Sequence, residues 1–177
     1  MTLTISDPPV DALDAAGPTA PLLRVRFRER VRSRVGVAEL LVVRVGEERY
    51  AFDVCSLDEV LDAPRVEYLP RVDSAMCGIT MHLERPLPLF DLSQLLGMPR
   101  GTGGTVLVMR ALGQRVGLLV NDVIEVRSIV LERVQPPPFD CDDELLLGVA
   151  WSDNELTAIM DARGIIAACQ PEAEGTL

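Results

Sequence analysis

The sequence has little of what an active site or a nucleic-acid surface requires. Histidine occurs once, at His82, and nothing near it supplies the third, orienting group of a nucleophile–histidine arrangement. Aromatic residues make up only 4% of the 177 residues, too few for a surface that binds single strands by base stacking. These shortages predict a protein that is not an enzyme, has no cofactor and is not expected to bind nucleic acid.

Cysteine and metal-binding patterns are also scarce. The four cysteines form no CxxC pair and no His–Cys cluster: Cys55, Cys77, Cys141 and Cys169. This spacing predicts free thiols and no disulfide framework. The acidic run DCDDE (140–144) lacks the glycine and the spacing of an EF-hand loop, so we expect a solvated loop and no metal site.

Long apolar runs are absent. No run approaches the roughly 18 residues that span a bilayer, and the N-terminus has no basic start followed by a hydrophobic stretch. We therefore expect a cytoplasmic protein without membrane insertion. The hydrophobic content of 48% is still high enough to fill a core.

The chain has no lysine, and its charge is unevenly spread. Residues 1–38 carry six arginines against four acids (+2), whereas residues 39–177 carry 11 arginines against 23 acids (−12). We expect residues 1–38 to form a flexible tail with an arginine-rich arm at 24–34. The arm is a solvated segment that leans on the acidic body or, as the alternative, binds nucleic acid or another anionic surface.

An internal repeat organises the rest of the chain. Seven residues of the window 41–60 recur at an offset of 66 in the window 107–126, and Gly78 recurs as Gly148 at an offset of 70. Two copies of this length are too few for a solenoid, so they indicate a duplication that gives two similar subdomains. We place the first repeat at about 40–97 and the second at about 105–166, within a domain spanning 39–168 that is followed by a C-terminal tail at 169–177.

Both repeats have the pattern of β-structure. The runs ELLVVRV (39–45) and TVLVMRA (105–111) are short and rich in β-branched residues, and each precedes a polar turn and a second apolar run. This pattern is typical of a hairpin. We expect an all-β protein made of two small barrels.

Later segments of the repeats give three further expectations. A third strand is expected at 86–92 and again at 156–162, with Pro86 and Pro88 favouring an edge or a bulge for the first. The run SQLLG (93–97) predicts one helical turn closed by a glycine. Trp151 aligns with Met81 and is expected in the core.

Three runs together resemble the CheW-type coupling-protein family: LLVVRVGEERYAFDVCSLDEVL (40–61), CGITMHLERPLPLFDLSQLLG (77–97) and RVGLLVNDVIEVRSIVLERVQPPP (115–138). The resemblance implies two pseudo-repeated, five-stranded SH3-like β-barrel subdomains. It also implies a non-catalytic adaptor between the cytoplasmic tip of a methyl-accepting chemoreceptor and the regulatory domain of a CheA-type histidine kinase. Those regulatory domains share the fold.

The resemblance also implies a set of partner-binding residues: Leu57, Glu59, Gly78, Gly117 and Val126. The alternative for Leu57 is an ordinary core position, and for the two glycines a bulge or bend in the barrel. The sequence departs from the family at 81–84, where Met-His-Leu-Glu replaces the usual Asn-Leu-Arg-Gly. This departure leaves an alternative open, in which the protein binds only one partner and modulates the signalling array.

Overall fold

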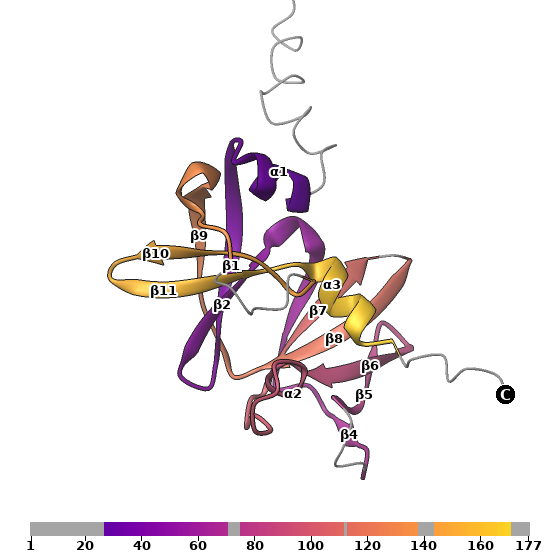
Figure 1. Ribbon diagram of the computed structural model, residues 1–177. Coiled ribbons are helices and arrows are strands. Elements are labelled where there is room, and N and C mark those ends of the chain that lie inside the picture. Colours follow the sequence, from indigo (N-terminus) through magenta and orange to yellow (C-terminus); the bar gives the residue numbers. More distant parts are fainter. Residues whose placement is uncertain (1–26, 71–74, 112, 138–143, 171–177) are drawn as a thin grey trace, which may run out of the picture.

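Within the residues that the structure describes, eleven strands form two β-sheets (Figure 1). The structure is a computed structural model that describes residues 27–70, 75–111, 113–137 and 144–170. Sheet A has the strand order β10-β11-β2-β1-β9, and sheet B has the order β3-β7-β8-β6-β5-β4. The protein is therefore all-β with a few short helices, as the sequence predicted.

Both repeats contain, in order, a hairpin, a third strand, a second hairpin and a short helix, while the position of the 3-10 turn differs and β4 has no strand counterpart in the second repeat. The first contributes β1 (Val37–Val45), β2 (Glu48–Asp53), η3 (Val54–Ser56), β3 (Leu57–Asp62), β4 (Glu67–Tyr68), β5 (Met76–His82), β6 (Arg85–Asp91) and α2 (Leu92–Leu95). The second contributes β7 (Thr105–Ala111), β8 (Gln114–Val120), β9 (Asp122–Val130), η4 (Leu131–Arg133), β10 (Leu146–Ser152), β11 (Glu155–Met160) and α3 (Ala162–Ala168). The hairpins predicted from the two apolar runs are β1–β2 and β7–β8.

The repeats exchange strands, so neither forms a sheet by itself. Strand β3 of the first repeat pairs with β7 of the second, and β9 of the second pairs with β1 of the first. The turn η3 redirects the chain from β2 to the other sheet, and the Asp53 carboxylate stabilises this turn by accepting the backbone N–H of Cys55. Each sheet thus depends on strands from both repeats.

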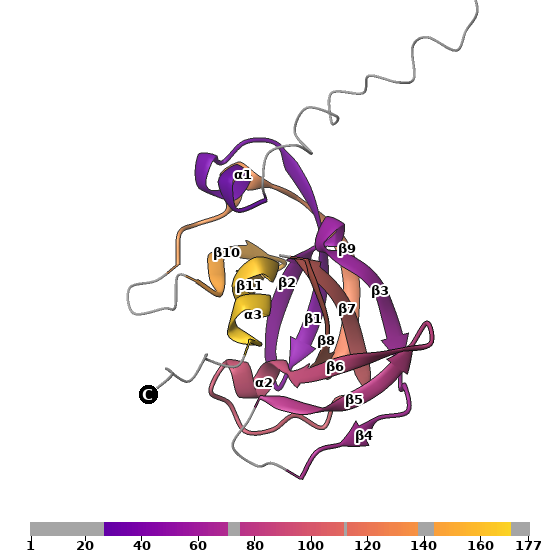
Figure 2. The same cartoon turned by 90° about the vertical axis from the view of Figure 1, so that its right-hand side faces the viewer.

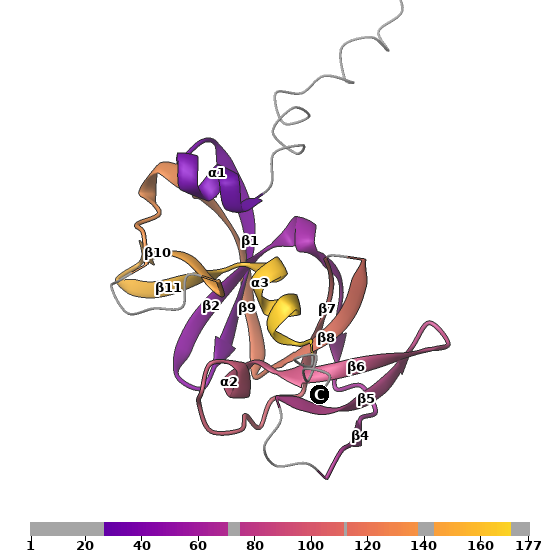
Figure 3. The ribbon, with the colours of Figure 1, turned by 45° about the vertical axis from the view of Figure 1, so that its right-hand side comes forward.

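Three clusters of buried side chains hold the sheets together. Sheets A and B each have a cluster of their own, built around Val42 and Val108 respectively. The largest cluster lies between the sheets and includes Ile165 and Ile166 of α3. Figures 2 and 3 show α3 running between the two sheets, where it covers this shared core.

The position of the two prolines differs from the expectation. Strand β6 lies inside sheet B, between β8 and β5, and not at its edge. Its pairing with β8 covers only Leu89–Asp91, so Pro86 and Pro88 lie in the part of β6 that β8 does not pair. Proline lacks the N–H that such a pairing would require, which explains why it is tolerated here.

The short helices begin at carboxylate caps. Asp91 accepts the backbone N–H of Ser93 at the start of α2, and Asp161 does the same for Arg163 in α3. Gly97 follows α2 with a φ of +70°, which confirms the predicted glycine stop. Among the described residues no helix is both long and apolar enough to cross a membrane.

Part of the predicted tail is ordered. Residues Phe27–Ser33 form helix α1, and β1 begins at Val37 instead of residue 39. Val31 of α1 is buried in the cluster of sheet A. At the other end, Cys169 is buried and caps α3, so the folded domain extends past residue 168. Residues 1–26 and 171–177 of the predicted tails, and 140–143 of the acidic run, lie outside the described residues.

Candidate functional site

Each sheet carries an exposed apolar patch, and the duplication relates the two patches. The sheet B patch consists of Val60, Met81 and Leu83, which line one groove between β3 and β5. The sheet A patch consists of the exposed residues Val126 on β9 and Trp151 and Leu156, which lie directly opposite each other in the β10–β11 hairpin. Contacts of Arg127 with Ser152 and Asp153 bring β9 close to the end of this hairpin. Val60 corresponds to Val126 at the offset of 66, and Met81 to Trp151 at the offset of 70. Clustered apolar side chains of this kind mark docking surfaces.

The exposure of Trp151 contradicts its expected place in the core. Its side chain is 61% exposed, and that of the equivalent Met81 is 65% exposed. The two residues therefore occupy equivalent positions, but these positions lie on the surface and not in the core. Both side chains lie on the solvent-facing side of their strands, β10 and β5.

A polar network lies beside the sheet B patch. His82 is only 7% exposed, its Nε2 lies 2.7 Å from Oε2 of Glu59, and its Nδ1 contacts the Arg115 guanidinium. Because arginine only donates, Nδ1 must accept, and the ring proton therefore sits on Nε2 and is donated to Glu59. Both ring nitrogens are engaged, so His82 joins β5 to β3 and β8 and has a structural role.

A related network lies beside the sheet A patch. Arg127 on β9 pairs with Glu125 at 2.6 Å and with Asp153 at 3.0 Å, and it contacts the Ser152 hydroxyl. Ser152 occupies the position equivalent to His82. In both sheets, polar side chains thus join two strands next to an exposed apolar patch.

Two of the predicted partner-binding residues belong to these surfaces. Val126 is 60% exposed in the sheet A patch, and Glu59 is half-exposed beside the sheet B patch. Leu57 is half-buried and packs against the core shared by the two sheets, which matches its alternative interpretation as a core position.

The two predicted glycines make close internal contacts. A Cβ on Gly78 would lie 2.6 Å from the Glu67 carbonyl oxygen, and one on Gly117 would lie 2.3 Å from Cδ2 of Leu89. The register of β5 and β6 also shifts between Met76 and Gly78, as expected for a bulge. Both glycines are buried, so a partner could sense them only through the shape of sheet B.

The altered 81–84 hairpin is closed by two residues with left-handed backbone. Leu83 has a φ of +50° and Glu84 a φ of +60°. The equivalent turn of the second repeat has Asp153 at +50° and Asn154 at +66°. Asp and Asn tolerate this conformation, whereas Leu and Glu adopt it at a cost. The φ values therefore show that this turn favours glycine, Asn or Asp over Leu and Glu.

The arginine arm is docked where the structure describes it. Arg28 binds Asp161, and Arg30 is buried and donates to the Val37 carbonyl. Only Arg32 and Arg34 of the described arginines in 24–34 are exposed. Two engaged guanidinium groups are unavailable to phosphate, which weakens the alternative of an anionic-surface binder.

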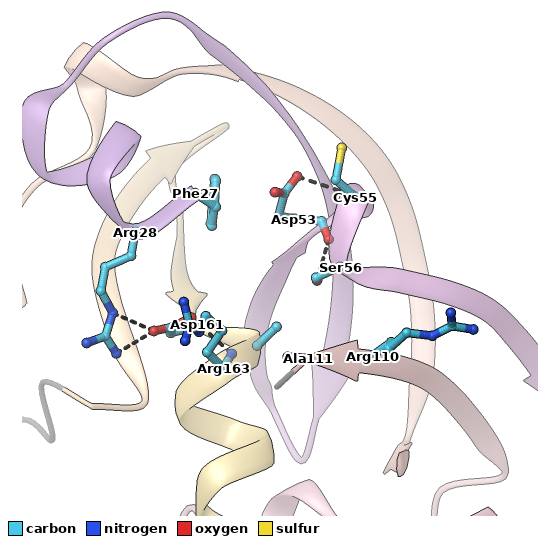
Figure 4. Close-up of a pocket in the computed structure, with 10 residues that line it drawn as sticks. Phe27, Arg28, Asp53, Cys55, Ser56, Arg110, Ala111, Asp161 and Arg163 are labelled. Carbon is cyan, nitrogen blue, oxygen red and sulfur yellow. Dashed lines mark hydrogen bonds and ion pairs between the residues drawn. The ribbon is translucent and has the colours of Figure 1, made fainter. Parts of the chain in front are cut away.

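A groove at the junction of the two sheets is a surface that sequence reasoning missed. It has a volume of about 430 Å³ and lies between α1, η3, the end of β7 and the start of α3, with Phe27, Ser56, Ala111 and Arg163 among its lining residues (Figure 4). Burial raises the pKa of the Asp53 carboxyl at its edge, the hydrogen bond from Cys55 opposing this shift. No sequence pattern links these four distant segments, so only the fold reveals the groove.

Two strand-exchanged sheets with an apolar patch on each and a groove between them define an all-β protein with several exposed surfaces of the kind that bind partners. No group of three or more His, Cys, Asp or Glu side chains among the described residues could hold a metal ion. The sequence comparison then specifies the family. The model of the CheW-like domain matches residues 39–170, and the chain belongs to this family.

The relatives agree with this assignment. FrzA of Myxococcus xanthus is 32% identical over 126 residues, which cover 68% of this chain and 79% of FrzA. A probable chemotaxis protein CheW of Rhizobium etli is 24% identical over 144 residues, covering 78% of this chain and 93% of the relative. The crystal structure of the scaffolding protein TtCheW from Thermoanaerobacter tengcongensis shares the fold, with a TM-score of 0.68 at 23% identity, and the match covers 80% of this chain and 97% of TtCheW.

Proposed function

We propose that the protein is a non-catalytic adaptor that couples the cytoplasmic tip of a chemoreceptor to the regulatory domain of a CheA-type histidine kinase. Membership of the CheW-like family supports a role as a chemotaxis adaptor. The observation that carries the proposal is the pair of equivalent apolar patches, because a bridging protein needs more than one docking surface on one rigid body.

The shapes of the surfaces suggest which partner each one binds. The patches lie on exposed strands, and such surfaces suit the strands of a regulatory domain with the same fold. The junction groove is concave and suits a protruding receptor tip. Glu59 and Val126 would contact the kinase domain directly, while Leu57, Gly78 and Gly117 would act through the shape of sheet B.

Binding measurements with the isolated regulatory domain and with the receptor tip test the proposal. Micromolar affinity for each, about −8 kcal/mol, is expected. Trp151→Ala should weaken binding to the regulatory domain by about tenfold or more, because a large exposed aromatic side chain is a typical hot spot. Val35→Ala, an exposed apolar residue outside both patches, is the matched control. If the wild-type protein binds neither partner, it is not a coupling adaptor.

The strained hairpin supports a second candidate, an adaptor-like protein that binds the receptor alone and modulates the array. Leu83 replaces an arginine whose planar, multi-donor group leucine cannot imitate. In this case the wild-type protein binds the receptor tip but not the regulatory domain, and Leu83→Arg combined with Glu84→Gly gains kinase binding. Unchanged kinase affinity in the double variant would exclude the hairpin as the cause.

A further inference from the structure

Helix α1 supplies a wall of the junction groove that the family domain by itself does not contain. The family match begins at residue 39, whereas α1 spans Phe27–Ser33. Phe27 lines the groove, and Figure 4 shows its side chain between α1 and the turn that carries Asp53 and Ser56. The groove thus has an aromatic side chain that comes from outside the matched residues.

Several contacts fix the position of this wall. Val31 is buried in the cluster of sheet A, and Arg28 donates from Nε to Asp161 at 2.5 Å and from its terminal nitrogen to the Glu144 carbonyl at 3.1 Å. Asp161 is also the N-cap of α3. The same carboxylate therefore connects α1 to α3, and these two helices form neighbouring walls of the groove, with η3 and the end of β7 on its other side (Figure 4).

Arg163 gives the groove a positive charge that no described carboxylate neutralises. In the described part of the chain its side chain makes no hydrogen bond or ion pair, and only its backbone N–H is engaged. The other two arginines of the groove are paired, Arg28 with Asp161 and Arg110 with Asp58. Of the two carboxylates that line the groove, Asp161 is neutralised by Arg28, and Asp53 accepts the Cys55 N–H.

We propose that Phe27 and Arg163 form a specificity subsite for an apolar side chain of the receptor tip and a neighbouring carboxylate. The apolar side chain packs against the Phe27 ring, and the carboxylate binds the Arg163 guanidinium, whose fork of donors matches it. This inference rests on the adaptor function proposed above and adds the chemistry of the partner segment. Aromatic and arginine side chains are also among the residue types that contribute most to binding.

The test uses the full-length chain, a receptor-tip fragment and the isolated regulatory domain. Phe27→Ala and Arg163→Glu should each weaken binding to the receptor tip by about tenfold. Binding to the regulatory domain should stay within about twofold, because the sheet patches are unchanged. Phe27→Leu should keep most of the affinity because it also keeps an apolar contact with sheet A. No described residue pairs with the Arg163 side chain, so its substitution should leave the fold intact.

Two comparisons separate a specific contact from a general charge effect. Arg44→Ala removes an exposed arginine paired with Asp122 and should leave tip binding unchanged. A set of tip variants, each with one Asp or Glu replaced by Arg, should contain one that restores binding to Arg163→Glu. If the wild-type chain binds the tip and the Phe27 and Arg163 variants bind equally well, the subsite is refuted and the adaptor function stands. An equal loss in Arg44→Ala also refutes the subsite, and failure of the wild-type chain to bind either partner refutes both proposals.

Discussion

The turn of the β5–β6 hairpin should become more stable when it receives residues that tolerate left-handed backbone. Leu83 and Glu84 have φ values of +50° and +60°, which cost a residue with a Cβ about 1–2 kcal/mol each. Glycine at position 84 removes this strain. Its greater conformational freedom in the unfolded chain offsets about 0.5–1 kcal/mol of the gain in stability. The expected net gain for Glu84→Gly is about 0.5–1 kcal/mol in the free energy of unfolding.

Adding Leu83→Asn creates the Asn-Gly sequence that two-residue hairpins prefer. Leu83 is 74% exposed, so the substitution removes little buried surface. The double variant should gain about 1–1.5 kcal/mol, which corresponds to a rise in Tm of about 3–5 °C for a domain of this size. Urea denaturation followed by circular dichroism measures the gain.

The second hairpin provides the control. Asn154 has a φ of +66° but already tolerates it, so Asn154→Gly should change the free energy of unfolding by less than about 0.5 kcal/mol. If Glu84→Gly stabilises the protein no more than Asn154→Gly does, backbone strain at the first turn is not the relevant quantity, and the argument from the φ angles is wrong.

Three further predictions concern the packing, the arm and the thiols. Gly78→Ala places a Cβ 2.6 Å from a carbonyl oxygen and should lower the free energy of unfolding by about 2 kcal/mol in the same denaturation assay. Gly104→Ala is the control, because a Cβ there has no neighbour within 4 Å, and it should have almost no effect. Arg28→Ala removes the partner of the buried Asp161 carboxylate, which caps α3, and should lower the free energy of unfolding by about 1–3 kcal/mol in calorimetry. An unchanged value would mean that α1 is not docked against the domain. Burial raises the pKa of the Cys169 thiol to about 12, so in mildly alkaline iodoacetamide the exposed Cys55 should react before Cys169 does. Labelling of Cys169 in the folded protein would contradict its burial.

Local patterns were sufficient to predict the first strand of each repeat. The runs at 39–45 and 105–111 are β-branched and short, and they form β1 and β7 with bounds that differ by at most two residues. The duplication was visible because equivalent strands keep the same side chains at a constant spacing. The expectation of a special residue at position 84 came from the resemblance to the family, and Glu84 has the left-handed backbone that such a turn position requires.

The site was only partly predictable. Val126 and Glu59 belong to the exposed surfaces, whereas Gly78 and Gly117 are buried in contact with Glu67 and Leu89. A sequence indicates that a glycine is needed for close approach, but it does not indicate whether the approaching group belongs to the same chain or to a partner.

The sequence by itself determined the all-β class, the two repeats and the family, because each depends on residue types at short and regular spacing. Only the tertiary structure decided that the repeats exchange strands, that Trp151 lies on the surface and that α1 closes the junction groove. These features depend on which distant strand pairs with which, and on whether another element covers an exposed face. The free energy of such long-range contacts is shared among many residues that are distant in the sequence. These contacts therefore cannot be inferred from any single stretch of the sequence.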